Sequence, residues 1–307
     1  MTLFAPEIVL QKIAAGYEFR QAELSRLKLE SNNIDRATFI GCYMRGAILT
    51  NISCKQANFK NTILTFAKLN DVDFNNANLE RTELNSAKLN DVNLSDANGY
   101  KLKAFGAKLN NVKAVHLNLP FADLRQIEGT NLYFSSANLN KSFISNARFK
   151  DINLERATVT NANFESTLII NSRWHRANLQ NTNLNKSKII NANFNDASLV
   201  NAKFTAADIN NTEFIAAELL ETNFIEAKLN RINFRDSNML SANFEGAQLS
   251  DIDFTNANLQ DANFENTSWK DVNFTNCIVS GAVFSNARGL TDIQKQYLRK
   301  NGALNVG

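Results

Sequence analysis

The sequence predicts an all-β fold: a β-helix in which the chain turns four corners in each coil of twenty residues. Three observations support this prediction. A large apolar residue recurs every five residues from Phe19 to Phe284, without insertion or deletion. A small or β-branched residue, most often alanine, comes two positions earlier. The other positions are mostly Asn, Asp, Lys, Ser, Thr, Glu and Arg, of which Asn, Asp and Ser are typical turn residues.

A period of five excludes a simple helix and a simple strand. An amphipathic helix has apolar residues about 3.6 positions apart, and a half-buried strand has them two apart. Residues two apart share one face of a strand, so the small and the large residue both point inward. Because five is odd, the chain must turn once in every repeat to bring the next pair back inside. The predicted corners carry residues that tolerate unusual backbone angles: Asn51, Asp71, Asp91, Asn111, Asn131, Asp151, Asn171 and Asn191.

The outward positions indicate how many corners make one coil. Lysine recurs directly before the large apolar residue at Lys28, Lys68, Lys88, Lys108, Lys188 and Lys228. Each step in this series is twenty residues or a multiple of twenty. The simplest interpretation is a coil with four sides, which predicts about 13 coils in all.

The pattern A-(N/D)-(L/F)-x-x resembles the pentapeptide-repeat family, and in particular its uninterrupted cyanobacterial members, over residues 17–289. Residues 77–98, ANLERTELNSAKLNDVNLSDAN, and residues 242–264, ANFEGAQLSDIDFTNANLQDANF, show it clearly. The resemblance implies a right-handed quadrilateral β-helix, a pentapeptide-repeat solenoid with short α-helical caps at both ends. Cyanobacterial members of the family include regulators of heterocyst differentiation. Other members mimic DNA and bind DNA gyrase.

We expect an N-terminal helical cap over residues 1–16, because the open end of a β-helix has unpaired backbone groups that need cover. Pro6 suits the first turn of this helix, and Gly16 suits its end. The apolar face of this cap is expected to contain Ile8, Val9, Leu10 and Ile13.

A second helical cap is expected over residues 290–307, after the repeats of residues 17–289. Thr291 and Gln294 have the spacing of a capping box, and Gly302 suits a helix end. The apolar face of this cap is expected to contain Ile293, Tyr297 and Leu298.

Composition excludes several classes of protein. Two prolines and 11 glycines among 307 residues exclude collagen and low-complexity disorder. The sequence contains no run of eighteen apolar residues, so we expect no membrane-spanning helix. The first residues lack the pattern of a secretory signal. The cysteines Cys42, Cys54 and Cys277 fall on inward positions, which favours a reducing compartment. We therefore expect a cytoplasmic protein, and a net charge of +3 does not favour nucleic acid or a membrane as a direct partner.

The sequence contains no pattern typical of catalysis or metal binding. P-loop, dinucleotide-binding, nucleophile-elbow and zincin motifs are all absent. His116 and His175 occupy outward positions without a neighbouring histidine or cysteine, which predicts solvated side chains. The unbroken repeat leaves no inserted loops to build a cleft. We therefore expect no enzyme activity, no small-molecule substrate, no cofactor and no metal.

The first candidate site lies where the repeat weakens. The large apolar residue is replaced by a small one at Gly99, Ala104, Ala114 and Gly129. The same stretch has aromatic residues in outward positions, with one arginine close by, and these are the candidate partner-binding residues: Tyr100, Phe105, Phe121, Arg125 and Phe143. Two alternatives stay open from the sequence. The coil bulges and tucks the rings inward, or the rings form an exposed site for a partner.

The second candidate site is a lysine column formed by Lys68, Lys88 and Lys108. Lys28 and Arg148 lie in line with it, and Asp71 and Asp91 are expected to offset its charge. The column is either a solvated side or a docking strip for an acidic partner. A smaller patch of Leu168, Ile170 and Ile190 is either a dimer contact or ordinary strand composition.

These observations favour a non-enzymatic scaffold that binds a protein partner, with a regulatory role in cyanobacterial cell differentiation by analogy alone. The alternative is a DNA mimic that binds gyrase or topoisomerase. Residues 205–292, with 13 acidic and 5 basic residues, favour the mimic, whereas the net charge and the lysine column oppose it. Both a monomer and a dimer, formed end to end or side by side, stay open.

Overall fold

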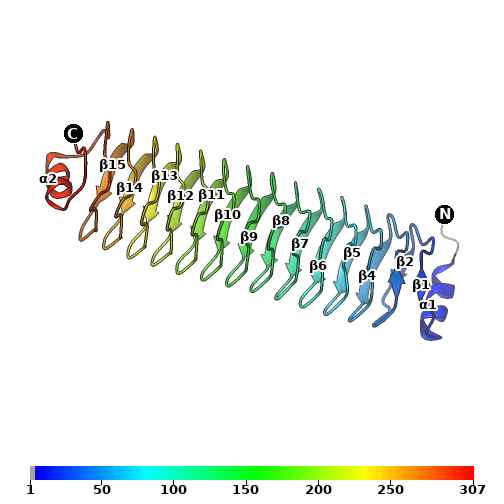
Figure 1. The fold of residues 1–307 in the computed structure, drawn as a ribbon. Coiled ribbons are helices and arrows are strands. Elements are labelled where there is room, and N and C mark those ends of the chain that lie inside the picture. Colours follow the sequence, from blue (N-terminus) through cyan, green and yellow to red (C-terminus); the bar gives the residue numbers. More distant parts are fainter. Residues whose placement is uncertain (1–3) are drawn as a thin grey trace. The chain divides into compact units, whose positions relative to one another are not determined.

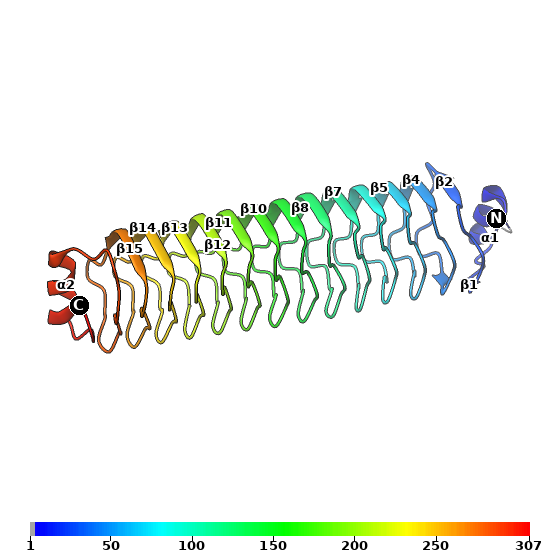
Figure 2. The same cartoon turned by 90° about the horizontal axis from the view of Figure 1, so that it is seen from above.

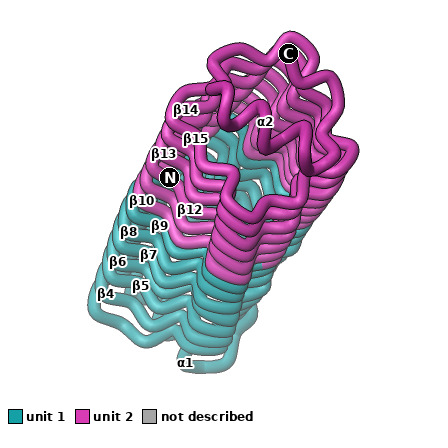
Figure 3. The backbone as a smooth tube through the Cα atoms, turned by 90° about the vertical axis from the view of Figure 1, so that its left-hand side faces the viewer, with its two compact units in different colours: residues 1–157 teal, residues 158–307 magenta. Residues whose placement is uncertain are grey.

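A computed structural model describes residues 4–307 and divides the chain into two compact units (Figure 3). Unit 1 is Met1–Ala157 and unit 2 is Thr158–Gly307. Residues 1–3 of the expected N-terminal cap lie outside the described residues. The limits expected for the caps and the repeat region stay a prediction.

Unit 1 consists of one helix followed by short strands stacked in chain order (Figure 1). Its elements are α1 (Pro6–Ala14), β1 (Phe19–Arg20), β2 (Lys28–Glu30), β3 (Phe39–Ile40), β4 (Ile48–Ser53), β5 (Lys68–Asp73), β6 (Lys88–Asn93), β7 (Lys108–Lys113), β8 (Glu128–Tyr133) and β9 (Arg148–Asn153). Strands β1 and β3 form a small separate sheet, and β2 leads a longer sheet that continues with β4 to β9.

Unit 2 also consists of stacked short strands, but its helix follows the strands in the sequence instead of preceding them (Figure 2). Its elements are β10 (Leu168–Arg173), β11 (Lys188–Asn193), β12 (Asp208–Glu213), β13 (Lys228–Asn233), β14 (Gln248–Asp253), β15 (Ser268–Asn273) and α2 (Asp292–Lys300). Each strand from β10 to β14 pairs with the strand that follows it in the sequence.

The strands pair in parallel with a register of twenty residues. Lys68 is paired with Lys88 in unit 1, and Leu249 with Trp269 in unit 2. Single bridges on the other sides keep the same step, as between Asn58 and Asn78. The predicted β-helix with a coil of twenty residues is therefore confirmed in each unit.

The corners adopt the left-handed backbone region, as the turn residues predicted. Every corner residue singled out in the sequence has a φ between 52° and 56°: Asn51, Asp71, Asp91, Asn111, Asn131, Asp151, Asn171 and Asn191. Asn and Asp tolerate this region better than most residues. Many corner side chains also form hydrogen-bonded ladders between coils, as where Asn191 Nδ2 donates to Asn171 Oδ1 at 3.0 Å. The corner sequence thus favours both the turn and the stacking of one coil on the next.

The interior of unit 2 is formed largely by two stacks of phenylalanine rings. One stack contains Phe194, Phe214, Phe234 and Phe254, and the other contains Phe204, Phe224, Phe244 and Phe264. Successive centroids in a stack are 4.8–5.3 Å apart, close to the spacing of paired strands. The two stacks meet edge to face, for example where Phe214 and Phe224 are 6.5 Å apart. Backbone pairing and ring stacking therefore share one repeat distance.

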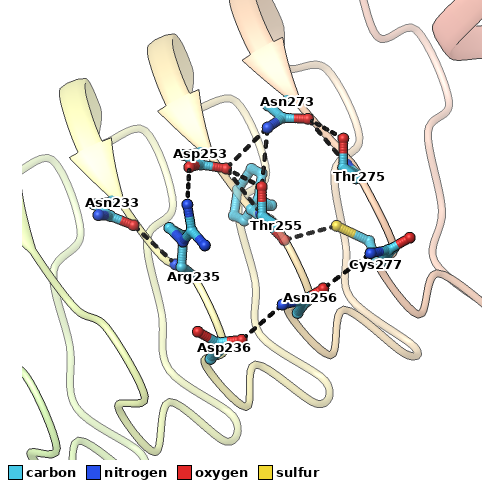
Figure 4. A network of polar contacts seen from close by, with 11 residues as sticks. Asn233, Arg235, Asp236, Asp253, Thr255, Asn256, Asn273, Thr275 and Cys277 are labelled. Carbon is cyan, nitrogen blue, oxygen red and sulfur yellow. Dashed lines mark hydrogen bonds and ion pairs between the residues drawn. The ribbon is translucent and has the colours of Figure 1, made fainter.

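The cysteines lie inside the coils, as their positions predicted. Cys42, Cys54 and Cys277 are buried and free. Burial raises the pKa of the Cys277 thiol to about 12. Figure 4 shows this thiol in unit 2 beside polar ladders, in which Asn256 Nδ2 donates to Asp236 Oδ1 at 2.9 Å. A thiol with so high a pKa is protonated at neutral pH and packs as a small apolar group.

Helix α1 confirms part of the expected N-terminal cap. Pro6 lies in its first turn, and Gly16 follows it with a φ of 75°. Val9 is buried and Ile13 is half-buried, which places these residues, four positions apart, toward the coil. Ile8 is 44% exposed, so its placement on the apolar face was wrong.

Helix α2 has the predicted capping box, in which Thr291 Oγ1 accepts a hydrogen bond from the Gln294 amide. Its buried face differs from the prediction, because Ile293 is 81% exposed. Two hydrogen bonds orient the helix on unit 2: Gln294 Nε2 donates to Val272 O, and Tyr297 Oη donates to Cys277 O. Residues three and four apart share a helix face, so residues 294, 297 and 298 face the coil and Ile293 points away.

Candidate functional site

The coils of unit 1 remain regular where the large inward residue is lost. The Gly99 amide donates to Asn118 O at 2.7 Å, and Gly129 pairs with Leu109 between β7 and β8. A Cβ atom on Gly99 would lie 2.4 Å from Cδ2 of Leu119, and one on Gly129 would lie 2.5 Å from Cδ1 of Leu132. Neighbouring leucines therefore fill the space of the missing side chains. The coil does not bulge, and the outward rings are not drawn inside.

The aromatic side chains of this stretch lie on the surface of unit 1. Phe105 is 38% exposed, Phe121 is 39% exposed and Phe143 is 51% exposed. Tyr100 is half-buried, and its ring meets that of Phe121 edge to face at 6.0 Å. The rings are therefore not tucked inside the coil, and their role as a site for a partner stays a prediction.

Cationic side chains lie over these rings. The Arg125 guanidinium is 5.8 Å from the centroid of Phe105, and Lys141 Nζ is 5.5 Å from that of Phe121. Lys101 Nζ is 5.2 Å from the ring of Tyr100. Cations within about 6 Å of a ring centroid are attracted by the ring. We name this surface the basic–aromatic face, and its residues are Tyr100, Lys101, Lys103, Phe105, Phe121, Arg125, Lys141 and Phe143.

Three members of the basic–aromatic face, Lys101, Lys103 and Lys141, were not predicted from the sequence. A signal for them was present, because residues 101–150 contain eight basic and two acidic residues. This local excess of positive charge is less evident when the first 150 residues are counted together. It indicates a site only once the positions in the coil show that these lysines lie beside the aromatic rings.

The centre of the basic–aromatic face is an open hollow of about 430 Å³. Its lining consists of Lys101, Lys103, Phe121, Asp123, Arg125 and Phe143. Arg125 forms a salt bridge of 2.7 Å with Asp123, and its hydrogen bond holds the pKa of that carboxyl below the usual value. Lys103 forms a salt bridge of 2.9 Å with Glu83. Within the described part of unit 1, Lys101 and Lys141 form no salt bridge, so the hollow keeps a positive charge.

The backbone at Phe121 adopts an unusual conformation for an aromatic residue. Its φ is 60°, in the left-handed region, where most corners have Asn, Asp or Ser instead. A side chain in this region costs roughly 1–2 kcal/mol for residues other than glycine, with Asn and Asp tolerated best. Phe66 has the same conformation at another corner of unit 1, with a φ of 62°, so the two positions form a matched pair for substitution.

The lysine column lies at the first residues of neighbouring strands in unit 1, on the side of the coil next to the basic–aromatic face. Lys68, Lys88 and Lys108 occupy equivalent positions in β5, β6 and β7 and are exposed. The column is interrupted by Glu128, which pairs with Lys108 at 3.0 Å and separates it from Arg148. At the other end, Ile48 in β4 follows Lys28 in β2. Lys68, Lys88 and Lys108 thus lie on adjacent strands, and Lys28 and Arg148 are each separated from them by one strand.

Charge compensation in the lysine column differs from the expectation. Glu128, rather than Asp71 or Asp91, provides the salt bridge to a lysine of the column. The Asp91 carboxylate instead accepts a hydrogen bond of 2.6 Å from Asn111 at the next corner. Corner carboxylates therefore serve the ladder between coils, and Lys68 and Lys88 form no salt bridge among the residues that the structure describes.

The remaining residues singled out by the sequence lie apart from the basic–aromatic face. His116 Nδ1 lies 3.3 Å from an Asp96 carboxylate oxygen, and His175 Nδ1 lies 3.0 Å from Asn195 O. The patch of Leu168, Ile170 and Ile190 in unit 2 is half-buried.

Over residues 4–307, no group of three or more His, Cys, Asp or Glu side chains is placed to hold a metal ion. None of the helices in this part is long and apolar enough to cross a membrane.

Two family descriptions match the sequence, and the matches fall in both units. The description "Pentapeptide repeats (8 copies)" matches residues 37–76, 64–98 and 133–169. The description "Pentapeptide repeat region" matches residues 187–264 and 207–284. No curated protein sequence matches the chain significantly.

Solved structures similar to this chain include pentapeptide-repeat proteins. One is trypsin-treated QnrB1, a plasmid-mediated fluoroquinolone resistance protein, with 16% identity and a TM-score of 0.41 over 89% of this chain and 94% of that chain. Another is HetL from the cyanobacterium Nostoc sp. strain PCC 7120, a pentapeptide-repeat protein involved in the regulation of heterocyst differentiation. It has 19% identity and a TM-score of 0.23 over 92% of this chain and 97% of that chain.

Proposed function

Because this chain belongs to the pentapeptide-repeat family, whose repeats form the rigid coils of both units, we propose that it is a non-enzymatic interaction module that binds another protein. The basic–aromatic face of unit 1 is the binding surface. One observation carries this proposal: the exposed rings of Phe121 and Phe143 line an open, positively charged hollow on a regular scaffold, and a third exposed ring, that of Phe105, lies under the guanidinium of Arg125. Aromatic residues and arginine are the residues that most often dominate the binding energy of protein interfaces.

The form of the hollow favours a protein over a small molecule. Small-molecule sites bury most of the ligand surface in an enclosed cavity. Here the rings of Phe105 and Phe143 stand at the surface and contribute apolar area outward. The hydrogen-bonded coils hold these rings in place before a partner arrives, which reduces the entropy lost on binding. A partner with an apolar patch surrounded by carboxylates fits this surface.

The proposal is tested by removing two rings that are not part of the core. The variant Tyr100→Ala/Phe121→Ala is expected to keep the fold, because neither side chain occupies an inward position. It is expected to lose at least nine-tenths of the partner protein that the wild-type chain captures from cells of the native host. Quantitative mass spectrometry of the captured proteins measures the loss, and thermal unfolding checks the fold.

A matched control lies elsewhere in unit 1. Tyr43 is 48% exposed, and Phe66 is 51% exposed with a left-handed φ of 62°. The variant Tyr43→Ala/Phe66→Ala therefore removes the same two residue types, one of them at a corner, outside the basic–aromatic face. It is expected to capture the partner as the wild type does. If both variants capture the partner equally well, the binding surface lies elsewhere and the lysine column is the next candidate.

A further inference from the structure

Unit 2 has a surface whose charge is opposite to that of the basic–aromatic face. Its carboxylates lie at outward positions on one side, and at the corners of that side, in three successive coils: Glu221, Glu226, Glu245, Asp261 and Glu265. All are exposed except Glu265, which is half-exposed. In the described part of unit 2, none of the five forms a salt bridge with a lysine or arginine. This surface therefore has five carboxylates that remain available to a cationic partner.

The charges on the two surfaces have the same spacing. Glu221 and Asp261 are corner residues with a φ of 53° and 56°, and they lie forty residues apart, which is two coils. Lys101 and Lys141 are corner residues with a φ of 56° and 57°, and they also lie two coils apart. At about 4.8 Å per layer, each pair spans roughly 10 Å. Two cations on one surface can thus face two carboxylates on the other at the same time.

Apolar residues lie beside the charges on both surfaces. In unit 2, Leu220 and Leu240 precede corner residues of the acidic surface, and Ile225 lies on the same side of the coil. These three side chains are half-buried and present part of their surface to solvent. On the basic–aromatic face, Phe121 stands between Lys101 and Lys141 in the corner column. An apolar strip within a frame of charges is the usual composition of a specific protein interface.

We propose that the acidic surface of unit 2 in one copy of this chain docks on the basic–aromatic face of unit 1 in a second copy. This inference rests on the proposed function and names the partner of that same site. Opposite charges at equal spacing favour this pairing, and like charges disfavour contact of each surface with itself. The two surfaces differ, so the contact closes into a two-fold dimer when both copies exchange it and otherwise extends into a chain of copies.

Sedimentation velocity of the purified full chain tests the inference. At low salt, about 50 mM, the wild type is expected to sediment as a dimer or larger species in a concentration-dependent manner. At about 500 mM salt the association is expected to weaken at least tenfold, because exposed charges are screened within a few ångströms. A wild type that stays monomeric at low salt over all concentrations overturns the inference.

Two charge reversals show whether these particular surfaces meet. The variant Lys101→Glu/Lys141→Glu makes the face of unit 1 acidic, and the variant Glu221→Lys/Asp261→Lys makes the surface of unit 2 basic. Each variant alone is expected to be monomeric, because its two surfaces then have charges of the same sign. An equimolar mixture is expected to associate, since the acidic face of the first variant meets the basic surface of the second. Association of either variant alone at wild-type strength contradicts the inference.

The outcomes separate this inference from the proposed function. If the wild type is monomeric and Tyr100→Ala/Phe121→Ala loses a captured host protein, the face binds a different protein and only the self-association is wrong. If the wild type associates but Tyr100→Ala/Phe121→Ala and Lys101→Glu/Lys141→Glu associate equally well, the self-association does not use the basic–aromatic face, and the capture of a host protein tests the proposed function on its own.

Discussion

Replacing Phe224 by alanine is expected to lower the free energy of unfolding by about 3–5 kcal/mol, the usual cost of deleting a fully buried phenylalanine ring. Phe224 is completely buried and stacks between Phe204 and Phe244, with centroids 5.0 and 4.8 Å away. It also meets Phe214 and Phe234 edge to face. The coils on both sides are fixed by backbone hydrogen bonds, so they cannot move together to fill the cavity.

Chemical denaturation of the wild type and of Phe224→Ala measures this cost. The control is Asn223→Ala, one position earlier and half-buried. Asn223 Oδ1 accepts a hydrogen bond of 2.9 Å from the Ile225 amide and one of 3.1 Å from Thr205 Oγ1. Losing such bonds at a half-exposed position costs about 1 kcal/mol. Equal losses of stability in the two variants would contradict the assignment of inward and outward positions.

Removal of helix α2 is expected to change the association state of the protein more than its stability. A chain that stops at Gly289 uncovers the ring of Phe284 and the last strand edge of unit 2. It also loses the hydrogen bonds from Gln294 to Val272 O, from Tyr297 to Cys277 O and from the Leu304 amide to Ala282 O. An uncovered strand edge with apolar side chains is a template for stacking another copy.

Light scattering is expected to show end-to-end association of the shortened chain, at high salt as well as at low salt, since apolar burial and backbone pairing drive it. The control is Ile293→Asn in the full chain, because Ile293 is 81% exposed on the far side of α2. This control is expected to keep the wild-type state. A shortened chain that also keeps the wild-type state would show that α2 does not protect the end of unit 2.

The sequence was sufficient to predict the β-helix, because every five-residue repeat imposes the same structural requirement. An odd period with paired inward residues requires a corner, and Asn51 and Asp71 show that the corner residues adopt the expected left-handed region. The inward positions of Cys42 and Cys277 followed from the same phase. A one-residue error in phase would have moved every large apolar side chain to the surface.

The caps were less predictable, because a helix of two or three turns has several apolar stripes of similar strength. Ile293 and Leu298 both looked suitable for the buried face of α2, and only Leu298 is buried. The hydrogen bonds of Gln294 and Tyr297 to the last coil decide the orientation of the helix. Such contacts between a helix and backbone carbonyls have no signature in the sequence.

The aromatic residues of the candidate site and Arg125 were predicted from the sequence, whereas its three lysines were not. The rings stood out in the sequence because they occupy outward positions in the stretch where the large inward residue is lost. The positions of Lys101 and Lys141 over the rings depend on side-chain conformations, which spacing alone does not specify. The salt bridge between Lys108 and Glu128 was a further side-chain contact of this kind.

Replacing Phe121 by asparagine, with Phe66→Asn as its matched control, tests most directly whether the basic–aromatic face binds a protein. Both positions have an exposed phenylalanine in the left-handed region, which asparagine tolerates better. Relief of backbone strain offsets the lost ring contacts, so a change of less than about 1 kcal/mol is expected, or roughly 2 °C in melting temperature for a chain of this length. Phe121→Asn is expected to lose at least nine-tenths of the protein captured by the wild type, and Phe66→Asn is expected to lose none. A wild type that captures no protein, or a folded Phe121→Asn that captures as much as the wild type, would contradict this account.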